Sequence, residues 1–462
     1  MSTLARPYRA LTIGLVVLVA LMAFEAIAVT AAMPAIVTAL DGLTVYGMAF
    51  GGTMAAGIVG TTVGGGWADA RGPAAPLWAG TAGFVAGLLL SGLATGMELL
   101  IAGRIVMGFG AGLATVAMYV IVGRAYPEEL HPRVFAAFAG AWLVPSLVGP
   151  AVAGVLVELA GWRWVFLGVA LLTAPAALAV APSMRSLADH RGDGARHGGR
   201  VLWAVGAAVG AVGLHFAGER HDPLLIPLFL AGLVATAPRT LPSGTFALKR
   251  GIPSLIVTRG LLGAAFAQAE VFIPLMLTRE RGYSTAAAGV SLTIGAVGWV
   301  AGSWLQSRAP RITPERKIGL GVVLVATGVT AAAVSVLPEA PIAVLLTGWV
   351  AGGFGMGVAY PTLSAQVLAL SAPSEQGANS SALQLGDQLF STTVLALGGT
   401  LFAAWVASSA SAAFLSSFVI AEALALLALV AVPRTVLPLR VRSGGTSVER
   451  SATGGAGATV EA

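Results

Sequence analysis

The sequence predicts an all-α polytopic membrane protein, because its composition is strongly apolar and its few charges are concentrated between apolar blocks. Apolar residues make up 57% of the 462 residues and charged residues 10%. The apolar blocks have the length that crosses a bilayer core as a helix, about 20 residues. A chain in lipid must satisfy its own backbone hydrogen bonds, which helices do. Too little chain remains for a soluble catalytic domain, so we expect neither an enzyme nor a nucleic-acid partner.

Fourteen apolar blocks are expected to span the membrane. They are 10–34, 46–66, 76–96, 99–122, 134–157, 163–182, 201–218, 223–238, 252–277, 284–305, 318–337, 341–366, 378–403 and 410–432. The eighth block is short for a crossing, so the alternative is twelve spans plus a re-entrant hairpin at the seventh and eighth blocks. Both alternatives place the two termini on the same side.

Lysines and arginines predict which side of the membrane is cytoplasmic. Of the 26, 20 lie on the side of the termini, four lie on the opposite side, and two, Arg104 and Arg259, lie within spans. Cytoplasmic loops are enriched in these residues. We therefore expect a multi-pass protein of the cell membrane with both termini in the cytoplasm.

An internal repeat divides the chain into two halves. The run from Gly65 to Arg71 is echoed 237 residues later from Gly302, and the run from Gly108 to Gly112 is echoed 245 residues later from Gly353. Two similar offsets predict two six-helix bundles of related sequence, with an inserted helix pair between them. The expected segments are a cytoplasmic tail at 1–9, the first bundle at 10–182, a linker at 183–200, the inserted pair at 201–238, a cytoplasmic loop at 239–251, the second bundle at 252–433 and a disordered tail at 434–462.

Four motifs carry a resemblance to a known family. They are Gly65-Gly66-Trp67-Ala68-Asp69-Ala70-Arg71-Gly72 after the second span, Arg104 before Gly108, Gly110 and Gly112 in the fourth, Pro145 before Gly149-Pro150 and Gly154 in the fifth, and Glu25 nine residues before Pro34 in the first. On these residues the chain resembles the major facilitator superfamily, specifically its drug:proton antiporter branch with fourteen spans. It departs from the family pattern at Ala70, where a basic residue is usual, and at Ala153, where a glycine is usual.

The resemblance implies a transport function. A member of this branch would be a monomeric, proton-coupled antiporter that exports lipophilic or cationic small molecules by alternating access, a multidrug-efflux type of activity. Its partners would be the substrate, protons and membrane lipid, and the proton gradient would replace a cofactor. A lipid or glycolipid exporter or flippase of the same fold is the alternative. A proton-coupled nutrient importer and a membrane-embedded enzyme are further alternatives.

Ionisable side chains within spans are the candidates for proton coupling, because each costs at least about 2.5–3.5 kcal/mol in the bilayer core. The candidates are Glu25, Arg104, Glu270 and Asp387. Helical rise places Glu25 about 14 Å and Arg104 about 8 Å from the outer ends of their spans, so the arginine side chain can close the gap. A permanent ion pair that fixes helix packing is the alternative for these two residues, and a buried hydrogen-bonded acid for the other two. A fifth intramembrane acid, Glu422, is expected to have a structural role or to lie at the lipid-facing edge.

Gating is expected at Gly65, Asp69, Arg71 and Gly72. A carboxylate at the inner end of one bundle can face the positive N-terminal end of a helix of the other bundle, here the span that begins near Ala378. A turn-forming aspartate in a short loop is the alternative.

A kinked antiporter-type helix and a substrate cavity complete the predicted site. Pro145, Gly149, Pro150 and Gly154 mark the antiporter helix, which its prolines would bend. The expected cavity residues are Met118, Tyr119, Trp142, Gln268, Tyr360 and Gln384, although such side chains also serve helix packing. No metal site is expected.

Overall fold

The computed structural model describes residues 8–127, 130–184, 198–219, 224–308, 311–371 and 376–435, and every regular element in these segments is helical. The α-helices are α1 (Arg9–Ala39), α2 (Tyr46–Arg71), α3 (Ala74–Gly92), α4 (Met97–Ala125), α5 (His131–Ala160), α6 (Arg163–Met184), α7 (Gly198–Glu219), α8 (Leu225–Thr240), α9 (Ile252–Arg279), α10 (Thr285–Ser307), α11 (Pro314–Val334), α12 (Ile342–Leu370), α13 (Gln376–Val406) and α14 (Ala410–Ala431). Short 3₁₀ helices lie at η1 (Leu43–Val45) and η3 (Val432–Arg434). The predicted all-α class is confirmed. Most of the predicted linker and disordered tail lies outside the described residues.

Twelve helices within the described residues are long and apolar enough to cross a membrane. α7 and α8 are not among them, since their apolar stretches are limited to Val205–Leu214 and Leu225–Thr240. The prediction of a polytopic membrane protein is therefore confirmed, whereas the count of fourteen spans is not.

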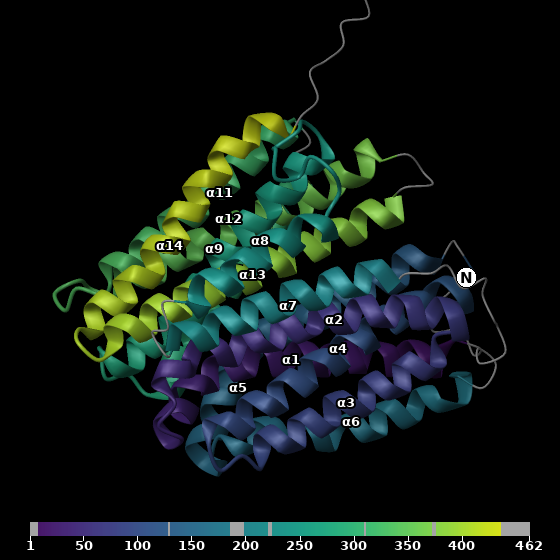
Figure 1. The fold of residues 1–462 in the computed structure, drawn as a ribbon, viewed down its shortest axis with the longest axis horizontal. Helices are drawn as coiled ribbons and strands as arrows, with labels where there is room; N and C mark the ends of the chain where they lie inside the picture. The colour runs from purple at the N-terminus through teal and green to yellow at the C-terminus, as the bar shows by residue number, and fades with distance from the viewer. Residues whose placement is uncertain are drawn as a thin grey trace, which may run out of the picture.

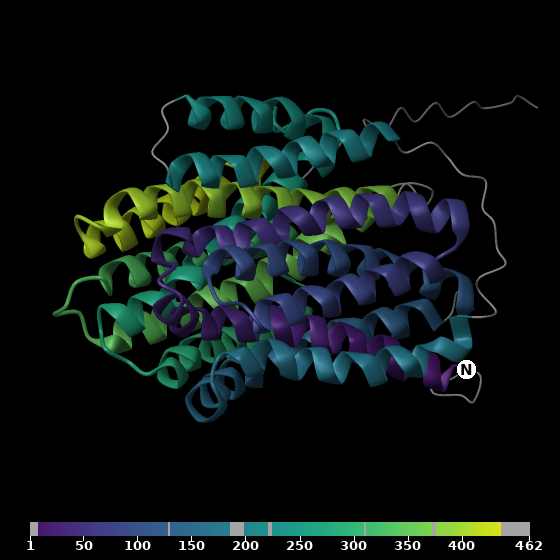
Figure 2. The ribbon, with the colours of Figure 1, turned by 60° about the horizontal axis from the view of Figure 1, so that its bottom comes forward.

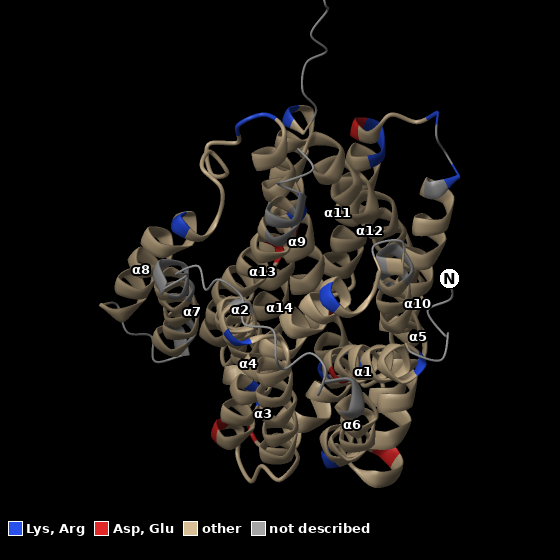
Figure 3. Ribbon diagram, turned by 90° about the vertical axis from the view of Figure 1, so that its right-hand side faces the viewer, with Lys and Arg blue, Asp and Glu red and all other residues tan. Residues whose placement is uncertain are grey.

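The other helices pack in two groups that follow chain order. α1 to α6 pack with one another and form the N-terminal half, and α9 to α14 form the C-terminal half (Figure 1). α7 packs on α2 of the N-terminal half and on α13 of the C-terminal half, while α8 packs on α7. The pair therefore lies outside both groups, which is plain in the turned view of Figure 2 and in the view along the helices of Figure 3.

Glycines allow backbone-to-backbone contact within each half. A Cβ atom on Gly108 of α4 would collide with the carbonyl oxygen of Thr53 on α2, and one on Gly60 of α2 would collide with that of Phe109 on α4. Without Cβ atoms the two helices approach closely, which is how helices associate in lipid. The C-terminal half repeats both contacts between α10 and α12, with Gly353 against Gly295 and Gly302 against Phe354.

These contacts correct the register of the internal repeat. Gly353 corresponds to Gly108, at the predicted offset of 245 residues, but Gly302 corresponds to Gly60, at an offset of 242 residues. The echo predicted between Gly65 and Gly302 is therefore wrong by five residues. α2 carries so many glycines that the sequence alone does not select the one that contacts α4.

The two halves meet across a seam, and the close contacts that the described residues make across it lie at one end of the molecule. Tyr46, in the first turn of α2, is fully buried and donates a hydrogen bond of 2.6 Å to the carbonyl oxygen of Val271 on α9. At the same end, a Cβ atom on Gly154 of α5 would collide with Ala286 of α10, and one on Gly289 of α10 would lie 2.7 Å from the carbonyl oxygen of Pro150. The ribbons of the two halves diverge toward the opposite end, which carries the N-terminus (Figure 1). We call the contacting end the outer end and the diverging end the inner end.

Candidate functional site

The N-terminal half contains a fully buried ion pair. The guanidinium Nη1 of Arg104 on α4 lies 3.0 Å from the carboxylate Oε1 of Glu25 on α1, and the two side chains are 4% and 5% exposed. The Nε of Arg104 also donates to the carbonyl oxygen of Ala49 on α2 at 2.5 Å, and the guanidinium lies 5.4 Å from the ring of Phe50. Arg104 therefore holds α1, α2 and α4 together. The structure brings together the two residues that helical rise placed within reach.

The C-terminal half contains a second ion pair, which is partly exposed. The Nε of Arg259 on α9 lies 3.4 Å from Oδ2 of Asp387 on α13, with the side chains 15% and 22% exposed. Tyr360 of α12 donates its hydroxyl to the other carboxylate oxygen at 2.7 Å, and its ring lies 4.3 Å from the Arg259 guanidinium. The Nη1 of Arg259 donates to the hydroxyl of Ser364 at 2.6 Å. Three helices of this half thus converge on one charged cluster.

Arg259 is the functional candidate that the sequence interpretation missed. The sequence places Arg259 within a span, but its acidic partner Asp387 lies 128 residues away on α13. α9 and α13 pack side by side along their lengths, with Gly260 against Phe390 and Gly398 against Gln268. This parallel pairing of distant helices brings Arg259 to Asp387. The sequence signal for this pair is an arginine within a span that has no acid nearby on the same helix, because such a charge needs a partner on another helix.

One face of α9 continues from this cluster toward Glu270. Arg259, Gly263, Phe266 and Glu270 are spaced by four, three and four residues, so they share a helix face. Glu270 is partly exposed and has no hydrogen-bond or ion-pair partner among the described residues. The acid lies about 16 Å along the helix from Arg259.

Aromatic rings cover the space beside this face. Phe266 stacks on Trp349 of α12 with ring centroids 4.5 Å apart and meets Trp299 of α10 edge-on at 5.7 Å. Trp299 in turn meets Tyr360 at 5.5 Å. Phe266 and Trp349 are buried, whereas Trp299 and Tyr360 are partly exposed. The partly exposed rings lie beside the charged cluster, where aromatic faces suit the binding of apolar or cationic groups.

The other predicted cavity residues are not brought together. Met118 is buried, whereas Tyr119, Trp142 and Gln384 are exposed. The Tyr119 ring meets the Phe138 ring edge-on. Gln268 is fully buried, with its amide packed where a Cβ atom on Gly398 would lie. Gln268 therefore does not line an open surface in this conformation. Of the six, Tyr360 alone is seen to join the charged cluster among the described residues.

The predicted gate is described only in part. Gly65 lies on α2, Arg71 is its exposed last residue and Gly72 follows it with φ of 80°. The side chain of Asp69 lies outside the described residues. The gating role remains a prediction.

The antiporter-type helix lies at the seam. Gly149 of α5 faces Phe24 and Ile27 of α1, with a closest approach of 3.5 Å for an added Cβ atom. Pro150 and Gly154 face α10, as described above, and Pro145 lies buried one helical turn before Gly149. The helix continues through both prolines.

The fifth intramembrane acid lies apart from both ion pairs. Glu422 is on α14, where it contacts Thr330 of α11. Its predicted structural role fits this position between two helices of one half, and remains a prediction.

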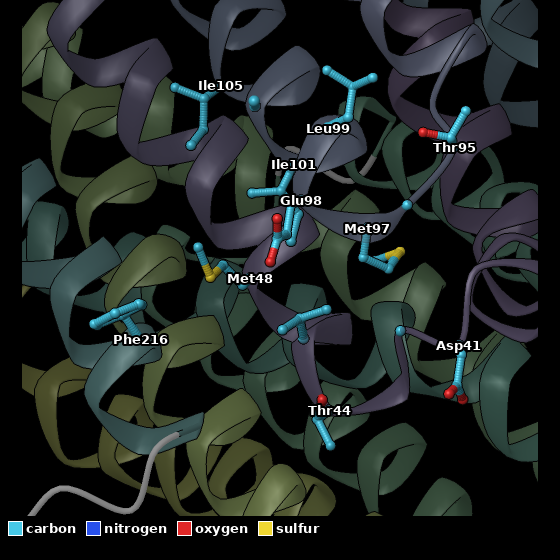
Figure 4. A pocket seen from close by; sticks show the side chains of 14 residues that line it. Asp41, Thr44, Met48, Thr95, Met97, Glu98, Leu99, Ile101, Ile105 and Phe216 are labelled. Atoms are coloured by element: carbon cyan, nitrogen blue, oxygen red, sulfur yellow. The ribbon is translucent and has the colours of Figure 1, made fainter.

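A surface pocket of about 750 Å³ lies at the outer end of the N-terminal half (Figure 4). It is bounded by the α1–α2 connection, the start of α4 and the end of α7, with Asp41, Glu98, Met48, Ile101 and Phe216 among its lining residues. None of the predicted site residues lines it. It is separate from both ion pairs.

Known transporters resemble this chain in sequence. The sequence model described as Major Facilitator Superfamily matches residues 13–342. A probable multidrug-efflux transporter of Mycobacterium tuberculosis is 26% identical over 339 residues, which cover 66% of this chain and 69% of the relative. A multidrug resistance protein B homolog of the same organism is 26% identical over 347 residues, covering 70% and 63% of the two chains. Multidrug resistance protein 3 of Bacillus subtilis is 24% identical over 234 residues, covering 48% and 46%.

Solved structures share the fold over nearly the whole chain. A bacterial homolog of the human lysosomal transporter Spinster superposes with a TM-score of 0.66 at 15% identity, covering 94% of this chain and all of the other. A D-xylose–proton symporter superposes with a TM-score of 0.63 at 14% identity, covering 93% and 98%. These likenesses show that the chain shares the fold of these proteins.

The charged cluster generates a prediction about Gly263. A Cβ atom at this position would collide with the Tyr360 hydroxyl and with Oδ1 of Asp387. We expect Gly263→Ala to separate these groups and to destabilise the protein by about 1–3 kcal/mol, the usual cost of overpacking. Thermal unfolding of the purified protein measures the effect. Gly319→Ala is the matched control, since its Cβ would meet only Val432, at 3.8 Å; equal unfolding temperatures for both variants would contradict the prediction.

Proposed function

Because the chain belongs to the Major Facilitator Superfamily, we propose that it is a proton-coupled secondary transporter that exports lipophilic or cationic small molecules across the cell membrane by alternating access. The buried Glu25–Arg104 pair carries this proposal. Relatives named as multidrug-efflux transporters at 26% identity support the export of drug-like compounds. The chain would act as an antiporter, with both termini in the cytoplasm.

Glu25 is proposed to carry the coupled proton. A carboxylate in a low-dielectric core is tolerated as an anion only beside a cation, and otherwise as the neutral acid. In the present conformation Arg104 provides that cation at 3.0 Å. A conformational change that weakens this contact or admits water would change the protonation of Glu25, and by linkage a proton gradient would bias the conformations.

The cluster around Arg259 is proposed to contact substrate. Its two charged side chains are 15% and 22% exposed, whereas those of the Glu25–Arg104 pair are 4% and 5% exposed. The second pair is therefore the more accessible of the two to a substrate that enters between the halves. An unpaired carboxylate beside aromatic rings favours a lipophilic cation.

The direct test is a transport assay in proteoliposomes with an imposed pH gradient. A panel of lipophilic cations is offered to the purified protein, and uptake against a substrate gradient is followed. We expect at least one compound to accumulate only while the pH gradient lasts. Transport of labelled lipid instead of the cations would favour the lipid-export alternative, and transport insensitive to the pH gradient would contradict proton coupling.

Glu25→Gln is expected to abolish uphill transport while leaving substrate binding and downhill exchange. The amide cannot release a proton, but it keeps the size of the carboxylic acid. Uphill and downhill transport are measured in the same proteoliposomes. Uphill transport at the native rate in the variant would make Glu25 structural, and Asp387 or Glu270 would become the coupling candidate.

Asp69→Asn is expected to favour the conformation that is open at the inner end. The proposed contact of Asp69 with the N-terminal end of α13 exists only when the inner end is closed, and a charge at a helix end is worth about two- to fivefold in an equilibrium. Substrate affinity should change little. Maleimide labelling of single cysteines at the inner end is free of background, because the chain contains no cysteine. Unchanged labelling would exclude the gating role.

The α7–α8 pair is proposed to lie beside the transport pathway. A single cysteine at position 221, between the two helices, reports which side of the membrane the connection faces. We expect labelling by an impermeant maleimide from outside if both helices cross, and from inside if they form a re-entrant hairpin. Protection of cysteines along α7 by substrate would show instead that the pair lines the pathway.

A further inference from the structure

The outer ends of α5 and α10 are joined by a hydrogen bond that crosses the seam. Glu158, two residues before the end of α5, accepts a hydrogen bond of 3.1 Å from the backbone N–H of Ala286. Ala286 lies in the first turn of α10, where backbone N–H groups lack partners within the helix and carry partial positive charge. The hydroxyl of Ser284 accepts from the next N–H group, that of Ala287. A carboxylate of the N-terminal half thus helps to cap a helix of the C-terminal half.

The same pattern of residues ends α2, at the other end of the molecule. Gly60, Gly65, Asp69 and Gly72 of the α2 segment are each followed 89 residues later by a counterpart, in order Gly149, Gly154, Glu158 and Gly161. In both segments the acid lies two residues before the end of the helix, and the next residue after the helix is a glycine with positive φ, 80° at Gly72 and 90° at Gly161. A left-handed glycine ends a helix without strain.

The fold explains why this pattern occurs twice. α5 is the third helix after α2 in a chain that runs back and forth, so the two helices run in opposite directions. Six-helix halves of this kind consist of two three-helix repeats of inverted topology, in which the second and fifth helices are counterparts. The Gly-and-acid pattern therefore lies at the inner end of α2 and at the outer end of α5. Both helices lie at the seam, α2 against α13 and α5 against α10.

The two copies of the pattern differ in whether their glycine contacts the opposite half. A Cβ atom on Gly154 would collide with Ala286 of the opposite half, so α5 and α10 are in backbone contact. A Cβ atom on Gly65 would approach only Val116, at 3.9 Å, which belongs to its own half. Gly154 of the outer copy therefore contacts the opposite half, whereas Gly65 of the inner copy does not.

We propose that Glu158 is the outer gating residue of the transport cycle: its carboxylate caps α10 and holds the outer end closed while the inner end is open, and it releases α10 when the outer end opens. Glu158 is then the inverted counterpart of Asp69, and the two acids favour opposite conformations. The inference rests on the alternating access of the proposed function. Glu158 belongs neither to the four family motifs nor to the two ion pairs, so the inference adds a residue to the proposed site.

The test measures the opening of the outer end directly. Leu93 and Leu337, which are 63% and 58% exposed, lie at the outer ends of the two halves and are replaced by cysteines for spin labels. Pulsed electron paramagnetic resonance of the full chain in lipid nanodiscs gives the distribution of distances between the labels. We expect Glu158→Gln to raise the ratio of long to short distances about two- to fivefold, the usual effect of a charge at a helix terminus. Asp69→Asn should change the same ratio in the opposite direction, and the double variant should return it toward that of the unsubstituted chain.

Two further variants separate gating from other effects. Glu339→Gln removes an exposed carboxylate at the outer end, away from the seam, and should leave the distribution unchanged. Gly154→Ala, whose Cβ would collide with α10, should favour the long distance even if Glu158→Gln does not fold. Equal shifts in Glu158→Gln and Glu339→Gln, or no shift in Glu158→Gln, would overturn the inference whatever Asp69→Asn does. A single distance in every variant, at acidic and at alkaline pH and with and without a lipophilic cation, would overturn alternating access itself.

Discussion

The structure depends on direct contact between helix backbones. In lipid, burial of apolar side chains gives little driving force for helix association, so close packing of backbones and polar contacts must supply it. Gly60 and Gly108 bring α2 and α4 together, and Gly302 and Gly353 do the same for α10 and α12. A side chain larger than hydrogen at these positions would push the helices apart. The α2–α4 contact also sets the place of Arg104 on α4, which donates to Ala49 of α2 and pairs with Glu25 of α1.

The two halves repeat this backbone arrangement but differ in their buried pairs. The offset of 245 residues that relates α4 to α12 places Trp349 where Arg104 stands in the N-terminal half. Arg104 pairs with Glu25 of the first helix of its half, and Trp349 stacks on Phe266 of the first helix of its own half. An aromatic stack has no ionisable group. At this equivalent position, therefore, the N-terminal half has an ion pair and the C-terminal half has a buried aromatic stack.

Local sequence signals predicted the features that depend on one helix or on neighbouring helices. Apolar blocks indicated the helices, and helical rise placed Arg104 within reach of Glu25, which the structure bears out as a contact of 3.0 Å. Features that depend on pairing between distant helices were not predicted. The contact of Arg259 with Asp387 requires the parallel packing of α9 and α13, and the burial of Gln268 requires Gly398 at the same interface. The predicted register of the repeat is wrong for a related reason. Several glycines of α2 fit the repeated motif, and only the packing of α2 on α4 shows that Gly60 is the counterpart of Gly302.

Differences between the contacts within a half and those across the seam explain how such a molecule can move. Within a half, glycine contacts recur along paired helices, so sliding one helix past another would drive Cβ atoms into backbone at several points. Across the seam, the close contacts of the described residues are at the outer end, where Gly154 meets Ala286, Tyr46 bonds to Val271 and Glu158 caps α10. The helix α7 also contacts both halves, through α2 and α13. In the proposed transport cycle, rotation of one half against the other would release the outer contacts and shift those of α7. In that cycle, an equal set of contacts at the inner end would keep the two conformations close in free energy, so that a modest difference in binding of the proposed coupled proton would shift the balance between them.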